Sequence, residues 1–181
     1  MTRIVLNRSS QEQQELAEEI ADLRPSLHRF ARSLAHDEEE AADLTQAALS
    51  AALLSSSGFR RGSNLKAWTF RILHNLHLNR RRSAARARLW LQGNGLDENV
   101  TTPSAPLDPV AHEVLTRLEV RSVLEAFRDL PRGYAIPLYL TAVEEMSYAD
   151  VARLLDIPIG TVMSRIHRAR RLLLARLSGA P

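Results

Sequence analysis

The chain has 181 residues, 45% of them hydrophobic and 25% charged, a balance typical of a folded globular protein with one medium or two small domains. It contains no cysteine, which excludes disulfides, thiolate metal sites and cysteine nucleophiles. Its N-terminus lacks the apolar run of a signal peptide, and no segment approaches the roughly 18–20 apolar residues of a membrane span, so we expect a cytoplasmic protein.

The net charge of +3 conceals a separation of charge along the chain. Residues 1–43 and 97–156 carry net charges of −5 and −6, whereas residues 44–96 and 157–181 carry +9 and +5 and contain no acid. Solvated surfaces usually mix the two signs, so two acid-free basic blocks indicate two contacts with a polyanion. The sequence leaves open whether the acidic blocks aid solubility, face a basic protein partner or touch the basic blocks within the free protein.

Helical periodicity extends along nearly the whole chain, and no segment shows convincing strand alternation. We expect a helix pair, or one helix interrupted near Pro25, over Glu12–Ala35. A helix over Asp37–Leu54 follows, and its acidic first turn suits the positive end of the helix dipole. After a Ser/Gly loop, Asn64 can cap a helix that runs to about Arg82.

Residues 93–109 contain Gly, Asn, Thr and three prolines and have little to bury, which is typical of a linker. Beyond it, helices are expected over Val110–Leu130, Tyr134–Val143, Ser147–Leu155 and Gly160–Leu177. The predicted fold is therefore all-α, with two small helical domains joined by a flexible linker, and the second domain contains a helix-turn-helix. The expected boundaries are residues 12–88 for the first domain, 89–109 for the linker and 110–177 for the second domain.

The sharpest local pattern is SYADVARLLDIPIGTVMSRIHRARRLLL. Ser147 and Asp150 have the spacing of a capping box. The DIPIG segment predicts a tight turn, because Asp156 tolerates the left-handed conformation and Pro158 cannot continue the first helix. The second helix then carries one apolar stripe at helical spacing, formed by Val162, Ile166, Ala169 and Leu173.

The opposite face of this second helix presents hydroxyls and cations and no carboxylate. Arginine suits guanine edges and phosphates, and hydroxyls suit several base edges, so the face is typical of a helix that enters the major groove. The alternative to DNA binding, which the sequence leaves open, is a plain helical corner with a solvated basic tail. The outward set consists of Gly160, Ser164, His167, Arg168 and Arg171, flanked by Thr161 and Arg165.

A second basic pattern, GSNLKAWTFRILHNLHLNRRR, covers residues 62–82. One face of this helix is expected in the core, and the opposite arc is expected to contact phosphates and an unpaired base. Small residues in the preceding FRRGSN loop allow close approach to an extruded base. The core set is Leu65, Trp68, Ile72 and Leu76, and the outward set is Phe70, Arg71, His74, Leu78 and Arg81, with His77 beside it.

Other interpretations of this helix stay open. Phe70 and Leu78 can instead pack on a neighbouring helix, and a basic amphipathic helix with Trp68 can bind an anionic membrane surface. His74 and His77 are spaced as a ligand pair, but no nearby acid or cysteine provides a third ligand, so no metal is expected. No cofactor-binding loop or catalytic constellation is apparent, so we expect neither an enzyme nor a small-molecule substrate.

Taken together, these stretches resemble the sigma-70-type factors of the extracytoplasmic function (ECF) group, which are small two-domain bacterial initiation factors. The resemblance runs from about Leu23 to Leu177 and rests on AADLTQAAL, on residues 62–82 and on the helix-turn-helix pattern. It implies binding to core RNA polymerase, recognition and opening of a promoter −10 element by the first domain, and recognition of a −35 element by the second. Control by an anti-sigma protein is also implied. The competing hypothesis is a helix-turn-helix regulator that acts without polymerase.

By motif match, the resemblance assigns residues to three surfaces. The polymerase-binding helix would carry Asp43, Leu44 and Gln46. The −10 surface would comprise Arg61, Gly62, Ser63, Asn64, Lys66, Arg71, Asn75, Asn79 and Arg80. The −35 surface would comprise Thr161, Ser164, Arg165, His167, Arg168 and Arg171.

The chain departs from the family pattern at four positions. Ala47 stands where the family usually has an acid, and Ala51 stands where it often has an arginine. Both positions lie on the expected polymerase-binding helix, so this contact is expected to differ in detail. Asp156 replaces the usual turn glycine. Pro137 lies inside the helix expected before the helix-turn-helix, where a kink would bear on binding of an inhibitory partner.

Overall fold

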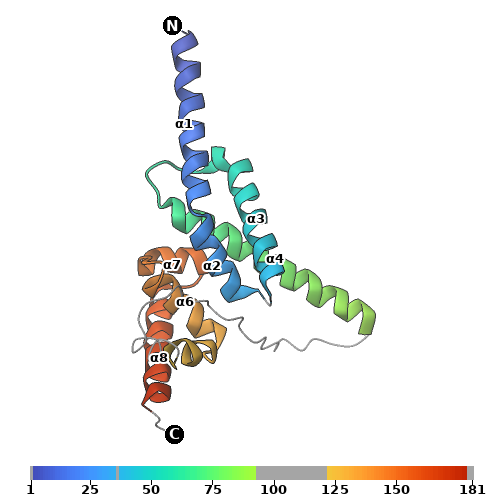
Figure 1. The fold of residues 1–181 in the computed structure, drawn as a ribbon, viewed down its shortest axis with the longest axis vertical. Coiled ribbons are helices and arrows are strands. Elements are labelled where there is room, and N and C mark those ends of the chain that lie inside the picture. The colour runs from blue at the N-terminus through green and yellow to red at the C-terminus, as the bar shows by residue number, and fades with distance from the viewer. Residues whose placement is uncertain (1, 36, 93–121, 179–181) are drawn as a thin grey trace.

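The computed structural model describes residues 2–35, 37–92 and 122–178, and these form helices and loops without a strand (Figure 1). The all-α prediction is therefore confirmed. The N-terminal helix group consists of α1 (Thr2–Asp22), α2 (Arg24–Leu34), α3 (Glu38–Leu54), a short 3-10 turn η1 (Ser56–Gly58) and α4 (Leu65–Gln92). Residues 122–128 are also helical. The C-terminal helix group consists of α6 (Arg132–Ala142), α7 (Tyr148–Leu155) and α8 (Ile159–Leu177).

Helix boundaries follow local chemistry at several of the predicted positions. The first two helices form a pair that is interrupted at Leu23, just before the proline. Asp37 caps α3, because its side chain accepts a hydrogen bond of 2.7 Å from the Glu40 backbone N–H. Pro137 lies buried inside α6, as expected from the sequence.

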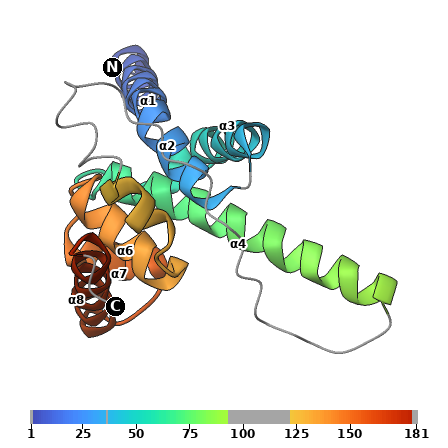
Figure 2. The ribbon, with the colours of Figure 1, turned by 60° about the horizontal axis from the view of Figure 1, so that its bottom comes forward.

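The end of α4 differs from the prediction. This helix continues to Gln92, ten residues beyond the expected end, and so includes the first four residues assigned to the linker. Residues 79–87 are all exposed, and the C-terminal end of α4 extends away from the packed body (Figure 2). No packing is needed there, since good helix formers such as Ala and Arg support the helix locally. The rest of the predicted linker lies outside the described residues.

The hydrophobic core is continuous between the two helix groups. Its centre is Phe30 of α2, which is fully buried. The Phe30 ring stacks on Phe70 of α4 at 5.2 Å between ring centroids and on Tyr139 of α6 at 5.8 Å. Aromatic stacking adds to the apolar area that the three rings bury. One side chain therefore joins elements from both ends of the chain.

None of the helices in the described ranges is long and apolar enough to cross a membrane.

We predict that Phe30→Ala lowers the free energy of unfolding by about 3–5 kcal/mol, because it leaves a cavity and removes both ring contacts. Leu54→Ala is the control, because Leu54 is 87% exposed and its loss should change stability by no more than about 0.5 kcal/mol. Urea denaturation followed by circular dichroism measures both variants. Equal effects of the two substitutions would contradict a core organised around Phe30.

Candidate nucleic-acid interface

The helix-turn-helix is built as the sequence predicts. The Ser147 hydroxyl accepts a hydrogen bond of 3.1 Å from the Asp150 backbone N–H and donates one of 2.8 Å to the Asp150 carboxylate, which caps α7. Asp156 adopts the left-handed conformation, with φ of 54° and ψ of 48°, and ends α7. Of the predicted apolar stripe of α8, Val162, Ile166 and Ala169 are buried and Leu173 is half-buried.

The outward face of α8 lies where the sequence places it. Gly160, Ser164, His167, Arg168 and Arg171 are exposed, and the flanking residues Thr161 and Arg165 are half-buried. Two of these side chains are oriented by contacts: the Ser164 hydroxyl donates to the Thr161 carbonyl at 3.0 Å, and the Arg168 guanidinium lies 5.8 Å from the Tyr134 ring centroid. The cation–π contact holds Arg168 without neutralising its charge.

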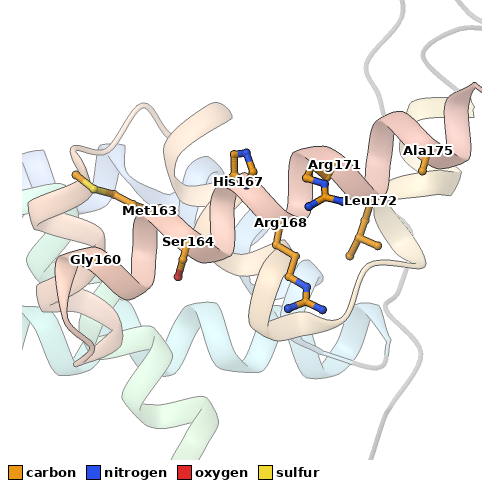
Figure 3. Close-up of a pocket in the computed structure, with 8 residues that line it drawn as sticks. All are labelled: Gly160, Met163, Ser164, His167, Arg168, Arg171, Leu172 and Ala175. Atoms are coloured by element: carbon orange, nitrogen blue, oxygen red, sulfur yellow. The ribbon is translucent and has the colours of Figure 1, made fainter.

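This face borders an open groove of about 800 Å³ (Figure 3). The groove combines cations with apolar side chains, since Met163 and Leu172 lie among the arginines. Ser164 and Arg168 extend from one side of α8 and His167 from another, so the helix presents polar groups over a broad arc (Figure 3). Such a surface can donate hydrogen bonds to phosphates and base edges.

The exposed side of α4 is narrower than predicted. Arg71, Asn75, Asn79 and Arg80 are exposed, and the first three follow one another at intervals of four residues along one helix face. Phe70 is fully buried, so the alternative in which it packs on a neighbouring helix is the one observed. α4 is covered from two directions, by α3 and by Phe30 of α2, and the predicted core set of α4 is only half-buried.

The outward prediction is also wrong for two histidines. His74 and His77 are buried on α4. Burial lowers the pKa of His74, and its Nδ1 finds no hydrogen-bond partner among the described residues. Within those same ranges no group of three acidic, histidine or cysteine side chains is arranged to hold a metal ion. Both histidines belong to the packing of α4 against its neighbours.

The loop before α4 forms a small pocket against α1. Gly62 has a φ of +86°, a conformation that side chains other than glycine rarely adopt. Arg61 is tied to α1, since its guanidinium donates to the Glu12 carbonyl. The pocket has a volume of about 160 Å³, far below that of drug-sized sites, and is suited to one small ring. Its lining consists of Leu16, Glu19, Phe59, Arg61, Gly62, Ser63 and Leu65.

Two residues assigned to the −10 surface contact the C-terminal helix group. The Asn64 side-chain oxygen Oδ1 accepts from the Ala67 backbone N–H at 3.0 Å, which confirms the predicted helix cap, while its side-chain NH₂ donates to the Asp150 carboxylate at 3.0 Å. Lys66 Nζ donates to the Glu144 carbonyl at 2.9 Å and lies 2.7 Å from Glu144 Oε2. The acidic block of residues 97–156 therefore contacts the basic block of residues 44–96 within the chain. Nothing in the sequence distinguishes Glu144 from its neighbour Glu145.

The polymerase-binding assignment falls on α3. Asp43 and Gln46 are exposed, but Leu44 is buried in the core and supports the helix from inside. Leu54, which was not singled out from the sequence, shares the exposed face with Asp43 eleven residues earlier. A leucine at a helix end carries no sequence signal for exposure, because the turn that follows decides whether it is covered.

Two family models match this chain. Residues 8–87 match the model described as Sigma-70 region 2, and residues 121–173 match the model described as Sigma-70, region 4. The first match includes the loop and the exposed residues of α4. The second includes the helix-turn-helix.

Curated relatives extend over most of the chain. The ECF RNA polymerase sigma factor EcfG of Rhodopseudomonas palustris (strain TIE-1) is 35% identical over 162 residues, which are 90% of this chain and 84% of the relative. The ECF RNA polymerase sigma factor SigM of Mycobacterium tuberculosis (strain ATCC 25618 / H37Rv) is 33% identical over 156 residues, which are 84% of this chain and 71% of the relative.

Solved structures share the fold. The sigma factor RpoE from Bartonella quintana, determined in complex with the anti-sigma factor NepR, matches with a TM-score of 0.71 and 29% identity and covers 91% of this chain and 98% of its own. CnrH, determined in complex with the cytosolic domain of CnrY, matches with a TM-score of 0.61 and 24% identity over 93% of this chain and 91% of its own. The second likeness concerns the fold alone.

The Asp150 carboxylate predicts a pH dependence of stability. Burial by itself would raise the pKa of Asp150, but hydrogen bonds from Ser147, Asn64 and Arg153 and the charge of Arg153 outweigh it, so the pKa is lowered. A lowered folded pKa means that the charged carboxylate stabilises the fold above its unfolded pKa of about 3.9. That stabilisation is lost as the pH falls through the folded value.

We therefore expect Asp150→Asn to be less stable than wild type by a constant free energy of unfolding from about pH 5 to pH 7. The difference should shrink below about pH 4, as the carboxylate becomes protonated in both states. Urea denaturation of both proteins as a function of pH measures it. A difference of the same size at the lowest pH would show that the charge of Asp150 has no part in the stability.

Proposed function

The chain belongs to the extracytoplasmic function (ECF) family of RNA polymerase sigma factors, and on that premise we propose a role for each of three surfaces. The loop before α4 and the exposed residues of α4 read and open the −10 element. The outward face of α8 reads the −35 element, and α3 binds core RNA polymerase. The protein acts in the cytoplasm, where promoter DNA and polymerase are found, and it acts by binding rather than by catalysis, without a cofactor.

The observation that carries this proposal is the pair of exposed, acid-free basic faces on α4 and α8. Phosphate neutralisation supplies most sequence-independent affinity for DNA, and each face offers arginines for it. The two faces belong to the regions that match the two sigma-70 models. We propose that they belong to two domains, residues 12–88 and 110–177, whose joint binding to one promoter raises affinity when polymerase sets their spacing.

Opening of the −10 element requires a place for an unpaired base. Unstacking and flipping a base costs a few kcal/mol, which stacking and phosphate contacts can offset. The pocket of about 160 Å³ between α1 and the loop supports this role. The Phe59 ring lines it and is braced by Trp68 at 5.2 Å between ring centroids. The adjoining single-stranded DNA then contacts Arg71, Asn75 and Asn79 along α4.

The exposed face of α3 supports the polymerase contact. Asp43 and Gln46 provide polar contacts at one end, and Leu54, 87% exposed, provides an apolar contact at the other. Burial of such an exposed apolar side chain against a partner is favourable, because it removes apolar surface from water. We also propose control by an anti-sigma protein, because a solved relative with 29% identity is a sigma factor in complex with one.

In run-off transcription with purified core polymerase, we predict that Arg165→Ala loses its dependence on the −35 element, because base contacts from arginine are worth about 1–3 kcal/mol each. Arg71→Ala should bind promoters nearly as wild type does but form open complexes at least tenfold more slowly, since about 1.4 kcal/mol corresponds to a factor of ten. Permanganate reactivity of unpaired thymines measures the opening.

Arg24→Ala is the matched control for both variants, because it removes the same charge from an exposed position on α2 outside both surfaces. Equal behaviour of all three variants would overturn the residue assignments. Failure of the wild-type chain to associate with core polymerase would overturn the sigma function itself and favour a regulator that acts without polymerase.

Gly62→Ala tests the loop. No atom lies within 4 Å of a Cβ built at Gly62, so the cost is backbone strain rather than a clash. The left-handed conformation costs other residues about 1–2 kcal/mol, which predicts open-complex formation slowed by roughly 5–30-fold. Gly58→Ala, where space is also free and φ is not positive, should leave the rate unchanged. Equal rates for the two variants would exclude a role for the loop conformation.

A further inference from the structure

Glu144 is a buried carboxylate at the junction of the two helix groups. Its side chain is 1% exposed, and it lies in the segment between α6 and α7. It accepts a hydrogen bond of 2.9 Å from the Tyr139 hydroxyl, and it lies 2.7 Å from Lys66 Nζ and 3.7 Å from the Arg29 guanidinium. A buried charge is tolerated only when it is paired in this way. Separation of the helix groups would break the Lys66 and Arg29 pairs together.

A second carboxylate from the same helix group acts beside it. Asp150 accepts from the Asn64 amide at 3.0 Å, so α4 meets one carboxylate at its cap and a second, that of Glu144, at Lys66. These contacts use donors that single-stranded DNA would otherwise take, since phosphate and base oxygens compete with carboxylates for the same N–H groups.

We propose that Glu144 and Asp150 form a latch that covers the start of the −10 surface in the free protein and competes with promoter DNA for Lys66 and Asn64. The proposal rests on the −10 role given to α4 above. It assigns a function to the acidic block of residues 97–156: two of its carboxylates occupy Lys66 and Asn64 until a partner separates the helix groups. The face of α8 stays exposed meanwhile, so the latch closes one DNA surface and leaves the other open.

The latch is opposed from within the same interface. Burial and the charge of Arg81 on α4 lower the pKa of Arg132 on α6, whereas Glu40 raises it. Stacking of Phe30 on Tyr139 favours the closed arrangement, as do the carboxylate pairs. Opposing contributions of this kind keep a contact reversible, which a switch requires.

Glu144→Gln in the full chain tests the latch, with Glu145→Gln as the matched control. Glu145 is the adjacent residue and is exposed, so its substitution changes the net charge equally without touching Lys66. The probe is a short fluorescein-labelled single-stranded DNA of randomised sequence, used without polymerase. We expect Glu144→Gln to bind it about tenfold more tightly than wild type, as when an open state rises from about a tenth of the population to nearly all of it. Glu145→Gln should bind like wild type.

Small-angle scattering of the same three proteins without DNA reports whether the helix groups separate. Glu144→Gln should have a larger radius of gyration than wild type, and Glu145→Gln should not. An unchanged radius would overturn the latch. A larger radius without tighter DNA binding would leave the contact real but overturn the −10 role of α4. Equal gains for both variants would attribute the effect to net charge and overturn the latch.

Tyr139→Phe is a second test in case Glu144→Gln does not fold. It keeps the ring that stacks on Phe30 and removes only the hydroxyl that donates to Glu144. Far-ultraviolet circular dichroism verifies folding. The expected result is a smaller change in the same direction in both measurements, and a folded Tyr139→Phe that behaves as wild type in both would count against the latch.

Discussion

The stacking of Phe30 between Phe70 and Tyr139 holds the described structure together. The three rings come from α2, α4 and α6, so a single buried side chain links the first quarter of the chain to the last third. Its burial decides which way α4 is turned. Because Phe70 points at Phe30, the exposed side of α4 carries Arg71, Asn75 and Asn79. The N-terminal cap and first turn of α4 face α7. The position of the proposed −10 surface is therefore a consequence of packing.

Charge separation along the chain has a structural counterpart in the same junction. Like charges gathered in one block repel one another, and the structure relieves part of this repulsion by pairing Lys66 with Glu144. A neutral donor, the Asn64 amide, hydrogen-bonds the Asp150 carboxylate beside this pair. The face of α8 finds no such covering among the described residues and keeps Arg168 and Arg171 exposed. The two proposed DNA surfaces therefore differ in the free chain: the start of the α4 surface is paired with carboxylates, and the α8 surface is exposed.

Much of the site could be predicted because it is local. The Ser147 cap, the left-handed Asp156 and the apolar stripe of α8 depend on residues within one or two helical turns of each other, so spacing alone reveals them. The same holds for Asn64 as the cap of α4. The sequence left the side of Phe70 open and placed His74 outward, because the helix is covered from two directions and periodicity cannot tell which of two faces packs more deeply.

The sequence by itself determined the all-α fold, the helix-turn-helix, the two basic blocks and the family. These follow from short-range spacing, from composition and from motifs that survive at about a third identity. Only the tertiary structure decided that Leu44 is buried, that Leu54 is exposed and that Glu144 rather than Glu145 is enclosed. Those outcomes depend on contacts between residues far apart in the chain. Adjacent residues of the same type can meet opposite environments, because a turn of the backbone sends one side chain into the junction and the next into solvent.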